Sequence, residues 1–247
     1  MYKGIVFAVA ILLPRLLIAQ SNDTLYVYGP GGPLAPFQEC GRVFTQRYHI
    51  PVKVSAGPES DWIADAKIHA DLFFGGAEYM LTQFEIAHPD LALRTSRIEL
   101  YKRAAGILVR PGNPKHIHSL QDLAKPGIKI LDVNGAGQLG LWEDLAGQTN
   151  SIAGIASNIA GTFGNSALGI DAWKMDKSYD AWVTFSSWHY RLREITELVP
   201  ITGTGAVYRG TPVEMSATSK RQHQVKQFME LLRSPEGHAI FKKWGWE

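Results

Sequence analysis

Residues 25–44, LYVYGPGGPLAPFQECGRVF, contain the pattern that decides the fold. The apolar run LYVYG predicts a strand, and it enters a loop of glycine and proline, PGGP. Phe37, Val43 and Phe44 then recur at helical spacing, which predicts a helix through about Tyr48. A strand, a tight loop and a helix in this order form the repeating unit of an α/β domain.

The same unit recurs twice downstream. PVKVSAG (51–57) and ADLFFGG (70–76) predict strands, and ESDWIADAKIH (59–69) and AEYMLTQFEIA (77–87) predict helices. The apolar run of ADLFFGG is continuous, which is typical of a parallel-sheet strand that is covered on both faces. This first series ends near Leu93.

A second series begins around Arg103 and continues to the last residues. The sequence shows no internal repeat, and no flexible linker separates the two series. We therefore expect two α/β lobes joined by strand crossovers, with the chain leaving the first lobe and re-entering it. The expected strands are 104–110, 128–134, 179–188, 197–201, 206–210 and 213–219, and the expected helices are 119–127, 135–148, 151–161, 165–175, 221–234 and 235–247.

Composition excludes several classes of function. The 247 residues carry a net charge of +2 with no long basic run, so nucleic acid is not an expected partner. The eight histidines are scattered without metal-ligand spacing, and we expect neither a metal nor a cofactor. Cys40 is the single cysteine, so an intrachain disulfide is impossible, and we expect it to pack in the core.

The N-terminus resembles a secretory signal peptide over residues 1–20. Lys3 supplies a positive charge, an apolar stretch follows, and the small residues around Ala19 suit cleavage before Gln20 or Ser21. The apolar run is shorter than the roughly 20 residues that a membrane span needs. We therefore expect an exported, periplasmic protein.

Three glycine-bearing turns connect strands to helices, at residues 28–33, 75–78 and 134–138. In open α/β sheets, ligands bind at the carboxyl ends of strands, where helix N-termini offer free N–H groups to an anion. Asn165-Ser166 and Glu59-Ser60 begin further helices and can add neutral donors. The alternative is that these glycines only terminate strands.

Arg103 and three aromatic residues have two interpretations each. Arg103 lies at a strand start between the lobes, where it either reaches an anion in the cleft or stays solvated or ion-paired. Trp182, Trp188 and Tyr79 either form a wall of the cleft or pack in the core.

The sequence resembles a family of periplasmic solute-binding proteins, accessory colonization factor C, which is related to the sulfate and molybdate receptors. The resemblance spans nearly the whole chain after residue 20, in the fragments LYVYGPGGPL, DLFFGGAEYM, ILVRPGNPK, KPGIKILDVNGAGQLGLWED and SPEGHAIFKKWGW. It implies a type II periplasmic binding fold, in which each lobe has a mixed, mostly parallel sheet flanked by helices. Lobe 1 is then expected at residues 21–102 plus 204–247 and lobe 2 at 103–203, joined by two crossovers, with the lobes closing on the ligand.

The resemblance also implies which residues hold the ligand. The expected donors and wall, with Arg103 as a further candidate, are Gly31, Gly32, Ser60 and Ala77 in lobe 1 and Gly137, Gln138, Asn165, Ser166 and Trp182 in lobe 2.

These features predict a non-enzymatic, monomeric receptor that binds a small tetrahedral oxyanion, with sulfate ahead of molybdate or thiosulfate. It would deliver the ligand to an ABC permease or a membrane sensor. One alternative is a receptor for a carboxylate or an amino acid that uses Glu78 or Arg103. Another is an exported hydrolase with Ser186, Ser187 and His189, although these residues lack a nucleophile-elbow context.

Overall fold

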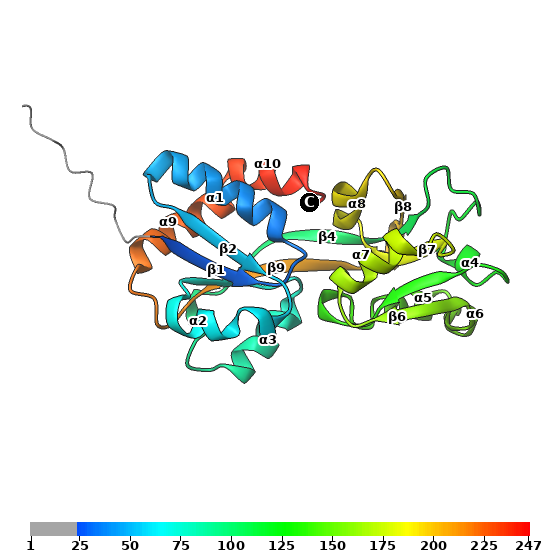
Figure 1. The fold of residues 1–247 in the computed structure, drawn as a ribbon, viewed down its shortest axis with the longest axis horizontal. Coiled ribbons are helices and arrows are strands. Elements are labelled where there is room, and N and C mark those ends of the chain that lie inside the picture. The colour runs from blue at the N-terminus through cyan, green and yellow to red at the C-terminus, as the bar shows by residue number, and fades with distance from the viewer. Residues whose placement is uncertain (1–23) are drawn as a thin grey trace, which may run out of the picture.

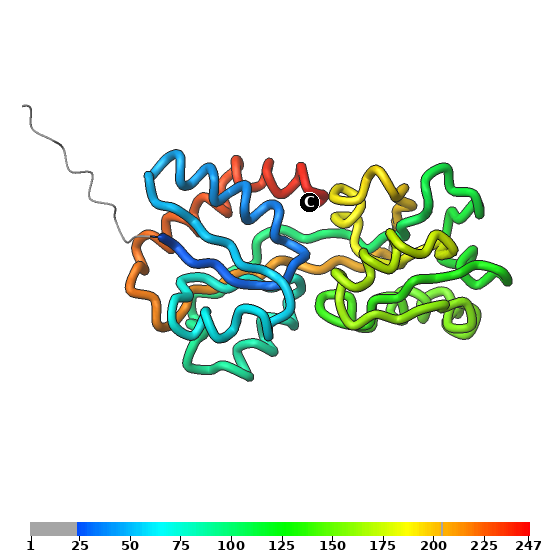
Figure 2. The backbone as a smooth tube through the Cα atoms, viewed as in Figure 1, coloured from blue at the N-terminus to red at the C-terminus, as the bar shows by residue number. Residues whose placement is uncertain are grey.

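The computed structural model describes residues 24–247, so the expected signal peptide lies outside the described residues. Two α/β bodies lie side by side, and two extended segments run between them (Figures 1 and 2). We call these bodies the first and second lobes. No helix within the described part of the chain is long and apolar enough to cross a membrane.

The first lobe contains both ends of the described chain. Its elements are β1 (Leu25–Gly29), α1 (Leu34–Tyr48), β2 (Val52–Ala56), η1 (Glu59–Asp61), α2 (Ile63–His69), β3 (Leu72–Phe74), α3 (Glu78–Ala87), η2 (Arg94–Ser96), α9 (Gln222–Arg233) and α10 (Pro235–Lys243).

The second lobe lies between the two crossing strands, β4 (Ile98–Val109) and β9 (Tyr208–Met215). Its elements are α4 (Leu120–Leu123), β5 (Ile130–Val133), η3 (Ala136–Gln138), α5 (Leu141–Gln148), α6 (Ile152–Asn158), β6 (Ile159–Phe163), α7 (Ser166–Met175), β7 (Ala181–Phe185), α8 (Ser187–Leu192), β8 (Glu197–Pro200) and η4 (Gly203–Gly205).

The strands form a continuous path in the order β2-β1-β3-β9-β4-β7-β5-β6, with β8 paired to β4. Within each lobe the neighbours of β1 and of β5 are parallel, whereas β9 and β4 pair antiparallel. The first part of β4 pairs with β9, and its last residues pair with β7 and β8. The long strand β4 therefore belongs to both lobes.

Each lobe has its own hydrophobic core. In β3 the side chains of Leu72 and Phe74 belong to a core cluster with residues of α1, α9 and α10, whereas Phe73 belongs to a separate cluster with residues of α2 and α3. Figure 1 shows α1 and α10 on one side of the first-lobe sheet and α2 and α3 on the other. This confirms the prediction of a strand covered on both faces. Cys40 is fully buried in the same core, and burial raises the pKa of its thiol to about 12.

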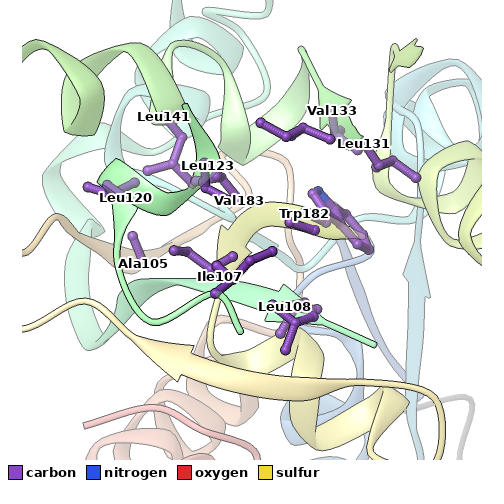
Figure 3. Close-up of a cluster of buried hydrophobic side chains, with 14 of the residues drawn as sticks. Ala105, Ile107, Leu108, Leu120, Leu123, Leu131, Val133, Leu141, Trp182 and Val183 are labelled. Carbon is purple, nitrogen blue, oxygen red and sulfur yellow. The ribbon is translucent and has the colours of Figure 1, made fainter. Parts of the chain in front are cut away.

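The core of the second lobe begins at Ala105 and surrounds Trp182 with Leu131, Val133 and Ile107 (Figure 3). The cores thus separate within β4, between Tyr101, which packs in the first lobe, and Ala105. The expected lobe boundaries, at 102/103 and 203/204, stay predictions.

Several elements differ from the sequence-based expectations. Residues 159–163 form β6 rather than the end of a helix, because they pair in parallel with β5. The helix expected from Gly135 begins only at Leu141, after a 3-10 turn and a left-handed Gly140 with φ of 69°. The helix expected at 119–127 is a single turn. The strands expected at 206–210 and 213–219 are one strand, β9.

Candidate ligand-binding cavity

A cavity of about 620 Å³ lies between the lobes. The first lobe lines it with the loops after β1 and β2 and with Gly76 after β3. The second lobe lines it with the turns after β5 and β6 and with α8, and Arg103 of β4 also lines it. The glycine turns containing Gly31 and Gly137 therefore face one crevice, at the carboxyl ends of the parallel strands, as the resemblance predicts.

Arg103 is the buried cation of this cavity. Its side chain has only 2% of its surface exposed, and its guanidinium carbon lies 4.1 Å from the ring centre of Phe185. One terminal nitrogen, Nη2, donates to the carbonyl oxygen of Gly76 at 2.6 Å, and Nη1 donates to Oγ of Ser187 at 3.2 Å. Its Nε has no hydrogen-bond partner among the described residues.

Arg103 has no ion pair with a carboxylate among the described residues. Burial lowers the pKa of its guanidinium to about 9, so the group keeps its positive charge at neutral pH. A buried charge without a counter-ion is costly, unless an anion enters the site. Arg103 therefore offers the cavity a positive charge that a carboxylate ion pair among the described residues does not neutralise.

A second cation, Arg191 of α8, was not predicted from the sequence. It donates from Nη1 to the carbonyl oxygen of Gly31 at 2.9 Å, which joins the second lobe to the first. Its guanidinium carbon lies 4.6 Å from the ring centre of Trp188, three residues earlier on the same helix, and both residues line the cavity. Partial burial lowers the pKa of Arg191.

The second lobe supplies neutral groups that are held in place. Asn165 caps α7, since its Oδ1 accepts from the backbone N–H of Leu168 at 3.0 Å. The side chain of Gln138 donates from Nε2 to Oγ of Ser166 at 2.8 Å and accepts from Nε1 of Trp182 at 3.1 Å. The bond from Gln138 uses only a lone pair of the Ser166 oxygen, so the hydroxyl hydrogen can still donate to a ligand.

Most predicted site residues line this cavity, and three do not. Ser60 is exposed and donates to Asp61, whereas Ala77 and Trp182 are fully buried, with Trp182 inside the core of the second lobe (Figure 3). Trp182 is therefore not a wall of the cavity, and its indole N–H instead donates to Gln138, which does line it. The residues that do line it are Gly31, Gly32, Arg103, Gly137, Gln138, Asn165 and Ser166.

Two acidic residues on the first-lobe side, Glu59 and Asp61, also line the cavity and were not predicted. Nε2 of His88 lies 2.7 Å from Oε1 of Glu59, which compensates part of that charge when the ring is protonated. Glu78, which the carboxylate hypothesis placed at the ligand, instead accepts from the backbone N–H of Gly210 at 2.5 Å.

Ser187 and His189, two residues of the hydrolase alternative, have other partners. Oγ of Ser187 accepts from Arg103, and Nδ1 of His189 lies 3.0 Å from Oγ1 of Thr196, so the two residues do not pair as nucleophile and base. Within residues 24–247, His, Cys, Asp and Glu side chains do not gather into a group that could hold a metal ion.

The comparison with known families agrees with this geometry. The family model described as bacterial extracellular solute-binding protein matches residues 25–247. The chain belongs to this family. A comparison with curated protein sequences gave no significant match.

The fold of this solute-binding protein is similar to several solved structures. L-phospholactate-bound PEB3 is 29% identical, with a TM-score of 0.84, over 90% of this chain and 99% of that chain. Peb3 from Campylobacter jejuni is 31% identical, with a TM-score of 0.81, over 90% and 99% of the two chains. The sulfate-binding protein SubI from Mycobacterium tuberculosis H37Rv is 19% identical, with a TM-score of 0.71, over 90% of this chain and 86% of SubI.

These likenesses confirm the predicted type II periplasmic binding fold and the predicted resemblance to solute-binding proteins related to sulfate and molybdate receptors. SubI shares only the fold at this identity, so it gives no information on the ligand.

Proposed function

We propose that this solute-binding protein reversibly captures a small organic phosphate, such as a phosphorylated carboxylic acid, in the cavity between its lobes. The observation that carries the proposal is Arg103, a buried guanidinium that lines the cavity and forms no ion pair with a carboxylate of residues 24–247. A phosphate group carries up to two negative charges and accepts several charge-assisted hydrogen bonds, so it matches this cation and the neutral donors around it.

The donors converge from both lobes. The first lobe presents the Gly31-Gly32 turn at the start of α1, and the second presents Ser166 at the start of α7. Both helices are long enough to add a favourable N-terminal dipole. Closure of the lobes brings the two sets of donors onto one ligand.

The size of the cavity favours an organic ligand over a bare sulfate ion. A volume of about 620 Å³ is within the range of about 300–1,000 Å³ that is usual for sites that bind organic molecules. Leu34, Met80, Ile170 and Trp188 form apolar parts of its wall. A recess of about 70 Å³ beside it, which also borders Met80, is lined by aromatic rings and offers room for a short apolar substituent.

The two cations suit a ligand with two anionic groups. Arg103 lies at the base of the crevice and Arg191 approaches from α8, so a phosphate and a carboxylate can each find a guanidinium. PEB3, whose structure was determined with L-phospholactate, supports this ligand class.

The proposed role involves binding and release and no catalytic step. The protein would act as an exported monomer that delivers its ligand to an ABC permease or a membrane sensor. Sulfate, which the sequence predicted, stays the competing ligand.

Calorimetry with the purified protein, unfolded and refolded to remove retained solute, tests the proposal. We expect L-phospholactate to bind at least about 100-fold more tightly than lactate, because hydrogen bonds to charged groups contribute about 1.5–3 kcal/mol each. Inorganic phosphate and sulfate are the matched anions without an organic body. Tighter binding of sulfate would contradict the organic part of the proposal, and no binding of any anion would contradict the whole.

A further inference from the structure

The last residues of the chain lie where the two lobes meet. Figure 1 shows the C end between α10 of the first lobe and α8 of the second. The backbone N–H of Glu247 donates to the carbonyl oxygen of Lys102 in the crossing strand β4, at 2.8 Å. We call residues 245–247 the terminal segment.

Trp246 is the buried anchor of this segment, with 2% of its surface exposed. Its indole N–H donates to Oγ1 of Thr211, a fully buried residue of the other crossing strand, at 2.8 Å. Its ring centre lies 5.4 Å from the guanidinium carbon of Arg103. Within the described part of the chain, Trp246 and Phe185 are thus the two rings over this guanidinium.

Gly245 brings the terminal segment against the second lobe. Its φ of 91° is in the left-handed region, which favours glycine. A Cβ built on it would stand 2.6 Å from the ring of Tyr190 and 3.0 Å from the Cα of Ser187. Both neighbours belong to α8, the helix that carries Trp188 and Arg191 into the cavity.

We propose that the terminal segment positions the ligand site. Trp246 orients the guanidinium of Arg103, and Gly245 allows α8 to pack against the terminal segment. Trp246 does not line the cavity, so it acts through Arg103 rather than on the ligand. The inference rests on the proposed function, because it assumes that Arg103 contacts the ligand.

The physical reason is the small number of groups that hold Arg103. Among the residues that the structure describes, its partners are one carbonyl, one hydroxyl and two rings, and its Nε has no hydrogen-bond acceptor there. Loss of one ring leaves the guanidinium with additional orientations, and a ligand must then select the correct one. A cation–π contact of a desolvated arginine contributes enough for an effect of about tenfold or more.

Trp244 provides a matched control in the same segment of chain. Its indole N–H also donates to a side-chain oxygen, Oε2 of Glu39 at 2.8 Å. That contact is to α1 of the first lobe, and Trp244 is not among the rings against Arg103. Replacement of either tryptophan by leucine removes one ring and one hydrogen bond, but only Trp246 lies at the guanidinium.

The experiment measures L-phospholactate affinity by calorimetry, with thermal unfolding of the free protein as the check on folding. We expect Trp246→Leu to weaken binding about tenfold or more, Trp246→Phe to retain most of the affinity, and Trp244→Leu to change it less than about twofold. In an Arg103→Lys background, which lacks the planar guanidinium, Trp246→Leu should have almost no further effect.

Equal affinities of the Trp246→Leu and Trp244→Leu proteins would overturn the inference. So would a loss of affinity on Trp246→Leu that persists in the Arg103→Lys background.

If Trp246→Leu does not fold, Thr211→Val removes the acceptor of the indole N–H and leaves the ring. NMR of the Arg103 Nε–H in this variant then reports how well the guanidinium is ordered. We expect the resonance to broaden, and an unchanged resonance would contradict the inference. A wild-type protein that binds no anion refutes the proposed function instead.

Discussion

Gly76 of the first lobe and Gly137 of the second lobe lie against each other at the base of the cavity. A Cβ built on Gly137 would stand 3.2 Å from the carbonyl oxygen of Gly76 and 3.2 Å from Nη2 of Arg103. The lobes therefore approach each other closely beside the buried cation, and the absence of a side chain at Gly137 permits that approach.

Gly137→Val tests whether this approach is needed for binding. The added methyl groups would hold the lobes apart near Arg103, and we expect ligand affinity to fall about tenfold or more. The core of neither lobe changes, so thermal unfolding of the free protein should be nearly unchanged. Gly147→Ala in α5, where a Cβ meets only an ordinary contact, is the control, and equal affinities of the two variants would contradict the account.

Arg103→Met removes the buried charge and keeps much of the side-chain volume. We expect ligand affinity to fall by at least about 30-fold, since loss of one partner of a desolvated charge pair costs about 2–5 kcal/mol. The free protein should not lose stability in proportion, because an unpaired buried charge is also removed. Retention of wild-type affinity in calorimetry would exclude Arg103 as a ligand contact.

Gln138→Leu tests the bridge between Trp182 and Ser166. The variant leaves the buried indole N–H of Trp182 without its acceptor, which costs about 1–3 kcal/mol of unfolding free energy. Urea unfolding measures this loss. Gln148→Leu, which removes only an exposed hydrogen bond to the Asp144 backbone, should cost far less.

Glu214 predicts a pH-dependent stability. The side chain is fully buried in β9, and burial together with the nearby charge of Glu85 raises its pKa to about 8, although Arg97 and Arg94 pair with Glu85. The folded protein then keeps the proton up to about pH 8, whereas the unfolded carboxyl releases it near 4.5. Stability should therefore fall as the pH rises between these values.

Glu214→Gln removes this titration. The unfolding free energy of the variant should exceed that of the wild type by roughly 3 kcal/mol at pH 7, because the wild-type protein must hold the Glu214 proton at a pH well above 4.5, and by almost nothing below pH 4.5. Urea unfolding across this range measures the difference. A difference that is independent of pH would show that Glu214 is ionised in the folded protein.

The sequence predicts those parts of the molecule that depend on local pattern. The continuous apolar run at Leu72–Phe74 predicts a strand buried on both faces, and the structure has one. The glycine turns at Gly31 and Gly137 each follow a strand, so they were expected to face one crevice from the two lobes, and both line the cavity.

The rest depends on contacts between distant residues. β6 has a weak pattern of its own and forms because β5 offers a free edge for pairing. Arg191 reaches the cavity only because α8 turns one face toward the first lobe, although its spacing from Trp188 was a usable signal. Nothing local indicates that Trp246 would meet Arg103, 143 positions earlier in the chain.

A crystal structure of the protein grown with excess L-phospholactate is the most direct test of the central claim. We predict the phosphate group within hydrogen-bond distance of Arg103, with additional donors from the Gly31-Gly32 turn of one lobe and from Ser166 of the other. A ligand held by one lobe alone, or outside the cavity with Arg103 still unpaired, would contradict it.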